Sequence, residues 1–231
     1  MNPPSHASAP FDDRPWYVRA AIPRDPVQRL LFALFLVCFC VSCINPPYLQ
    51  FMLMQHAPTL PAAFLLCFLA NRFEISRLSF GSILLFLALH TLGARYLYSY
   101  TPYDDWARAL MGRSISELFG FERNHFDRMV HFSYGLLLAI PIQEFERRHL
   151  GLSLALSSVL AVECILATSA LYEIIEWLVA VVFTPEWADH FLGMQGDVFD
   201  GQKDMALATA GAMISIGVMA AMHVSRTWGR K

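Results

Sequence analysis

Charged residues are missing from long parts of this sequence. Asp, Glu, Lys and Arg are all absent from residues 30–71, 78–94 and 205–225. Over the whole chain 56% of the residues are hydrophobic and only 16% are charged. A helix on a soluble protein needs a polar face, whereas an apolar run of about 20 residues matches the hydrocarbon core of a bilayer. The sequence therefore predicts an integral membrane protein.

Several functional signatures are also missing. The chain has no P-loop, no dinucleotide-binding fingerprint and no recognised nucleophile motif. It has no basic cluster, and its formal net charge is -2, so we expect no nucleic acid partner. Residues 1–29 form a long, Pro-rich stretch that contains Asp12, Asp13 and Asp25 before the first apolar run, unlike the short basic start of a signal peptide. We therefore interpret the first run as an uncleaved span and expect membrane lipids as partners, with the oligomeric state unknown.

The cysteines give no sign of a zinc site. All five lie inside apolar segments, namely Cys38, Cys40, Cys43, Cys67 and Cys164. No pair has the flanking residues of a metal site, so we expect these thiols to act as small apolar side chains that face lipid or other helices.

Six apolar runs have the length of membrane spans. They cover residues 28–44, 48–70, 78–96, 127–145, 152–182 and 204–225. Asn45-Pro46-Pro47 should end the first span, and Pro58 and Pro61 should kink the second. The expected fold is all-α, a polytopic membrane helix bundle of about six transmembrane helices. We expect a single transmembrane domain over 27–226, between a Pro-rich cytoplasmic tail at 1–26 and a short cytoplasmic tail at 227–231.

Lys and Arg are unevenly shared between the two sets of loops. The termini and the loops on their side of the membrane hold eleven of the 17 Lys and Arg residues, and the opposite side holds six. Because cytoplasmic loops are enriched in these residues, we expect both termini to lie in the cytoplasm.

The loop between the third and fourth spans contains an amphipathic pattern. In "DDWARALMGRSISELFGF", apolar residues recur at helical spacing between charged ones. This pattern predicts a helix that lies in the membrane interface. A gate over a substrate site is the alternative interpretation.

Polar residues gather at the ends of the last four spans. Because successive spans alternate in direction, the end of the third, the start of the fourth, the end of the fifth and the start of the sixth reach the same membrane face. The residues that this brings together are His90, Arg95, Tyr96, Asn124, Asp127, Arg128, His131, Tyr172, Glu173, Glu176, Gln195, Asp197, Asp200 and Asp204. Charge at this depth is costly, so such residues normally face the bundle interior and find partners.

The composition of this cluster is that of a metal site or a proton-transfer site. Imidazole together with carboxylates suits Zn, Mn, Fe or Mg, so a divalent metal is the cofactor to consider. The predicted metal ligands are His131, Glu173, Asp197 and Asp200. The predicted catalytic or ligand residues are Asp127, His131, Glu173, Glu176, Asp197 and Asp200. The other members of the cluster would support them. His131, Arg95, Arg128 or a metal could pair with Glu173 and the aspartates.

Three functions fit this cluster. The first is a metal-assisted enzyme that acts on an envelope lipid or a lipid-linked phosphate. The second is a proton- or cation-coupled transporter, in which carboxylates share protons and Glu163 near mid-membrane extends the path. The third is a structural or accessory membrane protein, in which salt bridges and helix caps hold the helix ends together.

Three motifs carry a family resemblance. "RNHFDRMVHFSYG", "SALYEIIEW" and "GMQGDVFDGQKDMALATAGA" occur in an order and spacing that resembles bacterial inner-membrane proteins of the YjdF type, a family with a domain of unknown function. Where that family tends to have Gly-Gly-His-Tyr-Thr-Tyr, this chain has "LGARYLYSY", with Arg95 in place of the His and with Tyr96 and Tyr98 retained. The resemblance implies a multi-span protein of the bacterial inner membrane and implies no reaction.

A shorter resemblance covers the last three spans. Asp127-Arg128-x-x-His131-Phe132, a Glu-bearing helix and Asp197-x-x-Asp200 before a Gly/Ala-rich span are similar to VanZ-like membrane proteins. Those proteins are linked to glycopeptide resistance, which implies a lipid or lipid-linked substrate of the cell envelope.

Overall fold

The computed structural model describes residues 22–182 and 195–228, with side chains up to Met222. Most of the two predicted tails, residues 1–21 and 229–231, lies outside the described residues. The elements are helices α2 (Pro26–Ser42), α3 (Leu49–His56), α4 (Thr59–Phe73), α5 (Arg77–Tyr96), α6 (Tyr103–Met111), α7 (Ile115–Phe119), α8 (Phe126–His149), α9 (Leu154–Val182) and α11 (Asp200–Trp228). The all-α prediction is confirmed, and the predicted spans begin and end within four residues of the observed helices.

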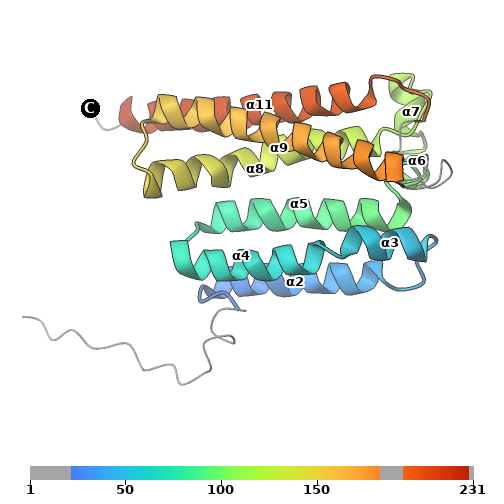
Figure 1. Cartoon of the computed structure of the whole chain (residues 1–231), viewed down its shortest axis with the longest axis horizontal. Coiled ribbons are helices and arrows are strands. Elements are labelled where there is room, and N and C mark those ends of the chain that lie inside the picture. The colour runs from blue at the N-terminus through green and yellow to red at the C-terminus, as the bar shows by residue number, and fades with distance from the viewer. Residues whose placement is uncertain (1–21, 183–194, 229–231) are drawn as a thin grey trace, which may run out of the picture.

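The long helices form two groups that α5 joins. Figure 1 shows α2, α3 and α4 on one side of α5, and α8, α9 and α11 on the other side. Four helical segments are long and apolar enough to cross a membrane, namely Leu49–Phe73, Arg77–Tyr96, Leu154–Val182 and Asp200–Met222. The apolar helix α2 is shorter, with 17 residues. The protein is a polytopic membrane helix bundle.

Helix α8 is long but less apolar than its neighbours. It has 24 residues, with acidic and basic residues near both ends. It packs against α5, α9 and α11, so neighbouring helices rather than lipid cover much of its surface. A helix in this central position can carry the polar groups that a lipid-facing helix excludes.

Local sequence explains where several helices begin. The side chain of Asp25 accepts hydrogen bonds from the backbone N–H groups of Val27 and Gln28 and so caps α2, which has Pro26 at its first position. Ser76 caps α5 in the same way through Ser79 N–H. The second predicted span divides into α3 and α4 on either side of Ala57 and Pro58, as expected from the proline.

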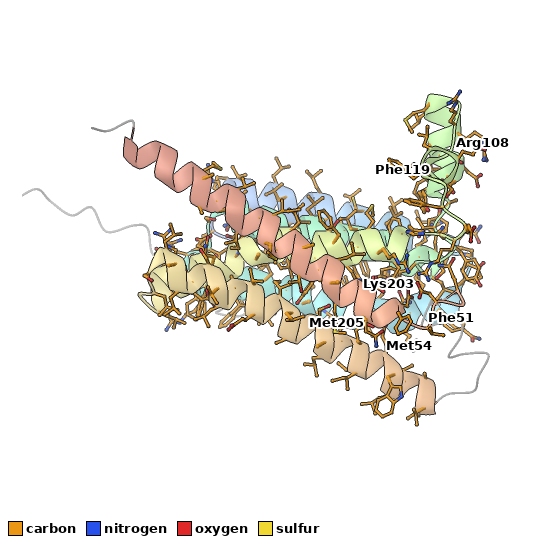
Figure 2. All side chains as sticks on the ribbon, turned by 90° about the horizontal axis from the view of Figure 1, so that it is seen from above. Phe51, Met54, Arg108, Phe119, Lys203 and Met205 are labelled. Atoms are coloured by element: carbon orange, nitrogen blue, oxygen red, sulfur yellow. The ribbon has the colours of Figure 1, made fainter. Side chains whose placement is uncertain are left out.

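The predicted interfacial helix is two short helices. Gly112 ends α6 with a left-handed backbone (φ 75°), a conformation that glycine adopts without a steric penalty. Ser114 then starts α7 through a capping box with Glu117. In Figure 2, α6 and α7, which carry Arg108 and Phe119, stand away from the bundle at one end. The pattern predicted the helical residues, and Gly112 divides them.

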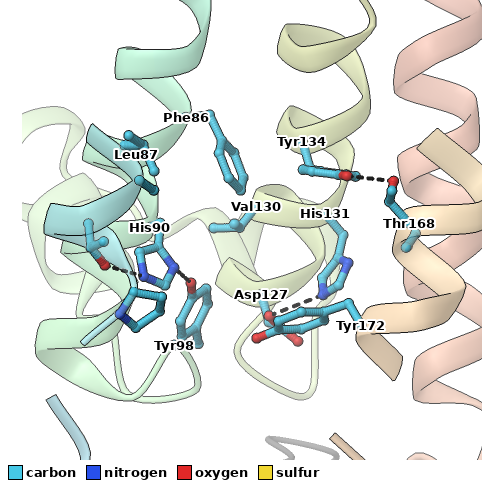
Figure 3. A pocket seen from close by; sticks show the side chains of 14 residues that line it. Phe86, Leu87, His90, Tyr98, Asp127, Val130, His131, Tyr134, Thr168 and Tyr172 are labelled. Carbon is cyan, nitrogen blue, oxygen red and sulfur yellow. Dashed lines mark hydrogen bonds and ion pairs between the residues drawn. The ribbon is translucent and has the colours of Figure 1, made fainter. Parts of the chain in front are cut away.

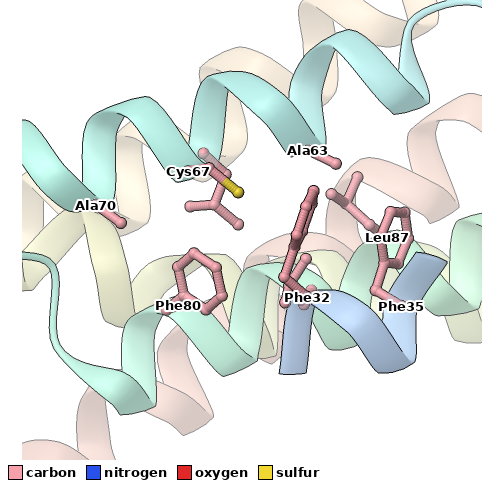
Figure 4. Packing of buried hydrophobic residues seen from close by; sticks show 9 residues of the cluster. Phe32, Phe35, Ala63, Cys67, Ala70, Phe80 and Leu87 are labelled. Carbon is pink, nitrogen blue, oxygen red and sulfur yellow. The ribbon is translucent and has the colours of Figure 1, made fainter. Parts of the chain in front are cut away.

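Each group of helices has its own core. Aromatic and small side chains interlock between α2, α4 and α5, where Phe32, Ala63 and Phe80 are buried (Figure 4). In the second group, Ala139 of α8, Ile165 of α9 and Ala208 of α11 are fully buried. Within the described residues the five cysteines are free thiols, and Cys67 belongs to the first core.

Helices α8 and α11 cross at very short range. A Cβ atom on Gly135 would lie 1.7 Å from the carbonyl oxygen of Ala208, and one on Gly211 would lie 2.2 Å from that of Phe132. No real Cβ atom approaches a backbone oxygen so closely, so both positions need glycine. Gly217, by contrast, has no atom within 4 Å of such a Cβ and takes no part in the crossing.

Gly211→Ala is therefore expected to force α8 and α11 apart. Overpacking of this kind costs roughly 1–3 kcal/mol, which lowers Tm by about 2–4 °C per kcal/mol in a chain of this size. Thermal unfolding of the purified protein in detergent would measure the change. Gly217→Ala is the matched control, because it adds the same methyl group to the same helix without a contact. Equal melting temperatures for the two variants would contradict the close crossing.

Candidate functional site

Four helix ends meet at the end of the bundle from which α6 and α7 project (Figure 1). They are the last turn of α5, the first turns of α8 and α11, and the last turns of α9. We call this the site end. The predicted site residues lie on these helices and on the segments that join them, but they fall into separate groups with different partners.

The first group is a compact set of possible metal ligands. One ligand atom each from Asp127, His131 and Asp204 lies within 4.8 Å of the others. Asp127 and His131 are one turn apart on α8, with 3.7 Å between His131 Nε2 and Asp127 Oδ1. Asp204 comes from α11, is 2% exposed, and its Oδ1 has no hydrogen-bond partner among the described residues. Two carboxylates and an imidazole thus converge where water has little access.

Glu173 of α9 adjoins this group. Its Oε1 lies 3.9 Å from His131 Nε2 and forms no hydrogen bond within the part of the chain that the structure describes. The other oxygen rests against Gly201, where an added Cβ would lie 2.6 Å from it. The missing side chain of Gly201 therefore makes room for the Glu173 carboxylate on the first turn of α11. Glu176 is half-buried one turn further along α9.

Asp197 and Asp200 form a second group, which is neutralised by cations. Arg123 Nη2 lies 2.7 Å and Arg128 Nη2 lies 3.3 Å from Asp200 Oδ1. Asp197 pairs with Arg128 and, at 2.6 Å, with Lys203 Nζ. Sequence analysis placed both aspartates among the metal ligands, whereas the structure gives their oxygens to guanidinium and ammonium groups. Arg128 correspondingly binds these aspartates and not Glu173.

Asp197 also holds the turn before α11, because its Oδ1 accepts a hydrogen bond of 3.1 Å from Phe199 N–H. The Lys203 ammonium, this N–H group and the Arg128 guanidinium hold the pKa of Asp197 well below its usual range. Helix α11 begins only at Asp200. Asp197, Asp200 and Asp204 are thus divided between a turn and a helix.

Asn124 and Gln195 join two distant segments. Gln195 Oε1 accepts from Asn124 N–H and Gln195 Nε2 donates to the Asn124 carbonyl, both at 3.0 Å. The Asn124 side chain also donates to the Thr101 carbonyl and accepts from Phe126 N–H, at the start of α8. These two predicted supporting residues therefore position the chain before α8 against the chain before α11.

Arg95 and Tyr96 were predicted as supporting residues and lie apart from the acidic groups. Arg95 Nη1 donates to the carbonyl oxygens of Ser42, at 2.5 Å, and Ile44, at 2.8 Å. It thereby satisfies carbonyls at the end of α2 that have no partner within that helix. Tyr96 packs edge-on against Trp106, with 5.9 Å between ring centroids.

A cavity of about 260 Å³ borders the metal-ligand group (Figure 3). Asp127, His131 and Tyr172 line one wall, and His90 and Tyr98 line the opposite wall. Apolar side chains form much of the rest, namely Pro58, Ala62, Phe86, Leu87 and Val130. His90 and Tyr172, both predicted as supporting residues, thus face this cavity.

The cavity opens at the side of the bundle. Pro58 and Ala62, on the α4 side, are exposed, and so are Thr168 and Tyr172 of α9 on the other side. These residues are among those that line the cavity, so its mouth lies between α4 and α9 and faces the region that lipid would occupy.

Sequence analysis missed Tyr98 as a site residue. Its hydroxyl is hydrogen-bonded to His90 Nδ1, and its ring fills space beside Gly93, where a Cβ would lie 2.8 Å from the ring. The only available signal was the tyrosine retained in "LGARYLYSY". Periodicity could not find it, because Tyr98 follows the end of α5.

Comparison with known proteins identifies the family. The family model described as "Predicted membrane protein (DUF2238)" matches residues 27–225. The chain belongs to this family. It is 33% identical over 172 residues to "Inner membrane protein YjdF" of Escherichia coli (strain K12). The aligned region covers 74% of this chain and 78% of that protein. No solved structure matches it. It is therefore a membrane protein homologous to an inner membrane protein.

Asp197→Asn is expected to destabilise the folded protein in a pH-dependent manner. Because the folded-state pKa is lowered, the ionised Asp197 stabilises the fold above the unfolded pKa of about 3.9. This stabilisation is lost as the pH falls further, through the folded-state pKa. Melting temperatures of the variant and the wild type should therefore differ at pH 7 and converge below pH 4.

Asp105→Asn is the control, because the side chain of Asp105 is 77% exposed and such surface ion pairs contribute little. A difference between Asp197→Asn and the wild type that stays constant from pH 7 to pH 3 would show that the carboxylate's charge is unimportant.

Proposed function

We propose that this protein is a metal-dependent membrane enzyme that hydrolyses an ester of an envelope lipid. The observation that carries the proposal is the buried group of Asp127, His131 and Asp204, with ligand atoms within 4.8 Å of one another. The cavity beside it, which opens toward lipid, supplies a place for the substrate.

Burial makes this group costly without a cation. A carboxylate removed from water needs a charged or hydrogen-bonding partner, yet Asp204 Oδ1 and Glu173 Oε1 form no hydrogen bond with any described residue. The nearby guanidinium groups are used by Asp197 and Asp200. A divalent ion would neutralise the remaining carboxylates, and one imidazole with carboxylates suits Zn, Mn, Fe or Mg.

The residues around the group could carry out hydrolysis. A divalent cation held there would lower the pKa of a bound water. Glu173 Oε1, 3.9 Å from His131 Nε2, is placed to accept that water's proton. In the proposed reaction the water oxygen would add to the ester centre and the bond to the lipid alcohol would break. The proton accepted by Glu173 would then pass to the departing alcohol.

The two other functions have less support. A proton path through the bundle was expected to continue through Glu163, but this side chain is exposed on α9. An accessory role has one observation in its favour, since Arg123 and Arg128 tie the loop before α8 to the start of α11 through Asp197 and Asp200. The metal content of the protein separates this role from the enzyme.

Purified wild-type protein, incubated with Zn²⁺, Mn²⁺ or Mg²⁺ and then desalted, should retain about one of these ions per chain. His131→Ala and Asp204→Asn should each weaken metal binding by more than about tenfold, since even loss of an outer-shell partner has this effect. Elemental mass spectrometry measures the ion, and size-exclusion chromatography checks the fold. Asp197→Asn is the matched control and should keep the metal, because cations already hold that carboxylate.

Wild-type protein that retains none of the three ions would remove the basis for the enzyme and leave the accessory role. Loss of the metal in Asp197→Asn to the same extent as in Asp204→Asn would show that the ligand group is assigned incorrectly.

We further propose that both termini lie in the cytoplasm and that the site end faces the periplasm. The excess of Lys and Arg on the terminal side, eleven against six, supports this orientation. Green fluorescent protein fused after Lys231 should fluoresce, and alkaline phosphatase fused after Gly120, beyond the third span, should be active. The reverse pattern would place the site end in the cytoplasm.

A further inference from the structure

The wall of the cavity opposite Asp127 and His131 carries a second polar group. In Figure 3, His90 and Tyr98 face the cavity from the α5 side, and a hydrogen bond joins His90 Nδ1 to the Tyr98 hydroxyl. Neither residue belongs to the metal-ligand group. The proposed hydrolysis leaves this pair without a role.

The direction of the hydrogen bond follows from the other side of the imidazole. His90 Nε2 lies 3.2 Å from the carbonyl oxygen of Gln55 and 3.0 Å from Thr59 Oγ1. A carbonyl can only accept, so Nε2 carries the ring proton and Nδ1 is the acceptor. The Tyr98 hydroxyl therefore donates to His90, and its oxygen is left as an acceptor of hydrogen bonds.

The backbone is strained where it places Tyr98. Leu97 and Tyr98 have φ angles of 55° and 52°, a left-handed conformation that is unfavourable for bulky residues. Gly93 leaves the space that the Tyr98 ring fills, and Leu97 beside it is 2% exposed. Backbone strain that is maintained by the surrounding packing is typical of functional positions. We therefore expect the Tyr98 hydroxyl to have a function.

The charge of the lining selects among lipid headgroups. None of the 14 described residues that line the cavity is Lys or Arg, whereas Asp127 is among them. Without a positive side chain, and with three carboxylates in or beside the proposed metal site, the cavity offers poor stabilisation to an anionic headgroup. The apolar lining between the two polar walls suits an acyl chain that enters between α4 and α9.

We propose that the cavity binds an uncharged lipid with a free hydroxyl group, and that this hydroxyl donates a hydrogen bond to the oxygen of Tyr98. The inference rests on the proposed function in so far as the cavity is the substrate site, and it names the substrate class. His90 is the positioning residue that directs the Tyr98 proton away from the ligand.

Three probes with the same acyl chain test the proposal on the full-length protein in detergent with EDTA present. Monooleoylglycerol has free hydroxyls and no charge, oleoylglycerol phosphate adds an anionic group, and methyl oleate lacks a hydroxyl. Native mass spectrometry titrations should show that the wild type binds monooleoylglycerol about tenfold more tightly than methyl oleate, as expected for one hydrogen bond. It should also bind monooleoylglycerol more tightly than oleoylglycerol phosphate, because no positive side chain is among the described residues that line the cavity.

Tyr98→Phe should remove the preference for monooleoylglycerol over methyl oleate and bind these two uncharged probes alike. The variant keeps the ring beside Gly93, so its fold is expected to be retained. Tyr96→Phe is the matched control, because Tyr96 packs against Trp106 and should keep the wild-type preference. Unchanged binding of monooleoylglycerol by Tyr98→Phe, or tighter binding of oleoylglycerol phosphate by the wild type, would overturn the proposal.

Metal analysis of the same protein variants, loaded with metal and desalted without EDTA, distinguishes the two proposals. Tyr98-dependent binding in a protein that never holds a metal would support the ligand class and reject the hydrolase. A metal-binding protein without Tyr98-dependent binding would reject the ligand class and leave the metal centre standing. Tyr98→Phe itself should keep the wild-type metal content.

Discussion

The close crossing of α8 and α11 is the constraint on which the rest of the site depends. The two helices begin at the same end of the bundle, and their backbones meet where Gly135 faces Ala208. One turn nearer the site end on each helix stand His131 and Asp204, since both lie four residues before these contact positions. Backbone contact between glycine and alanine thus sets the spacing of an imidazole and a carboxylate.

Neutralisation of charge at the site end is uneven, and this produces the candidate centre. Arg123, Arg128 and Lys203 are committed to Asp197 and Asp200. Asp127, Asp204 and Glu173 lie further along the helices, around His131. The ion pairs stabilise the chain turns that enter α8 and α11, while the deeper carboxylates surround His131 and form the candidate metal-ligand group. The cluster predicted from the sequence is therefore divided in two: a set of ion pairs around Asp197 and Asp200, and a candidate metal centre around His131.

The division of the bundle into two packed groups explains the position of the cavity. Each group has its own interlocked core, and α5 meets α8 between them. The cavity lies along this boundary, between α4 and α9, with the candidate metal centre on one wall and the Tyr98–His90 pair on the other. A ligand there would touch both groups, so its binding would couple the two halves of the bundle.

The sequence alone determined the class of protein, the number of long helical segments and most of their limits. These features act through neighbours in the chain, so they can be read from the order and spacing of the residues. They are the uncharged runs, the helix caps Asp25 and Ser76, and the helix breaker Pro58. The family follows from three motifs for the same reason.

Only the tertiary structure decided which polar residues share a site. Arg95 serves α2 rather than Glu173, Arg128 binds Asp197 and Asp200, and Tyr98 enters the cavity through a strained turn. These pairings join residues 50 or more positions apart, as with Arg95 and Ile44 at 51, or depend on backbone angles that periodicity does not report. The alternating direction of successive spans places charged residues at one membrane face. The partner of each charge is fixed by helix packing, at distances of a few ångströms.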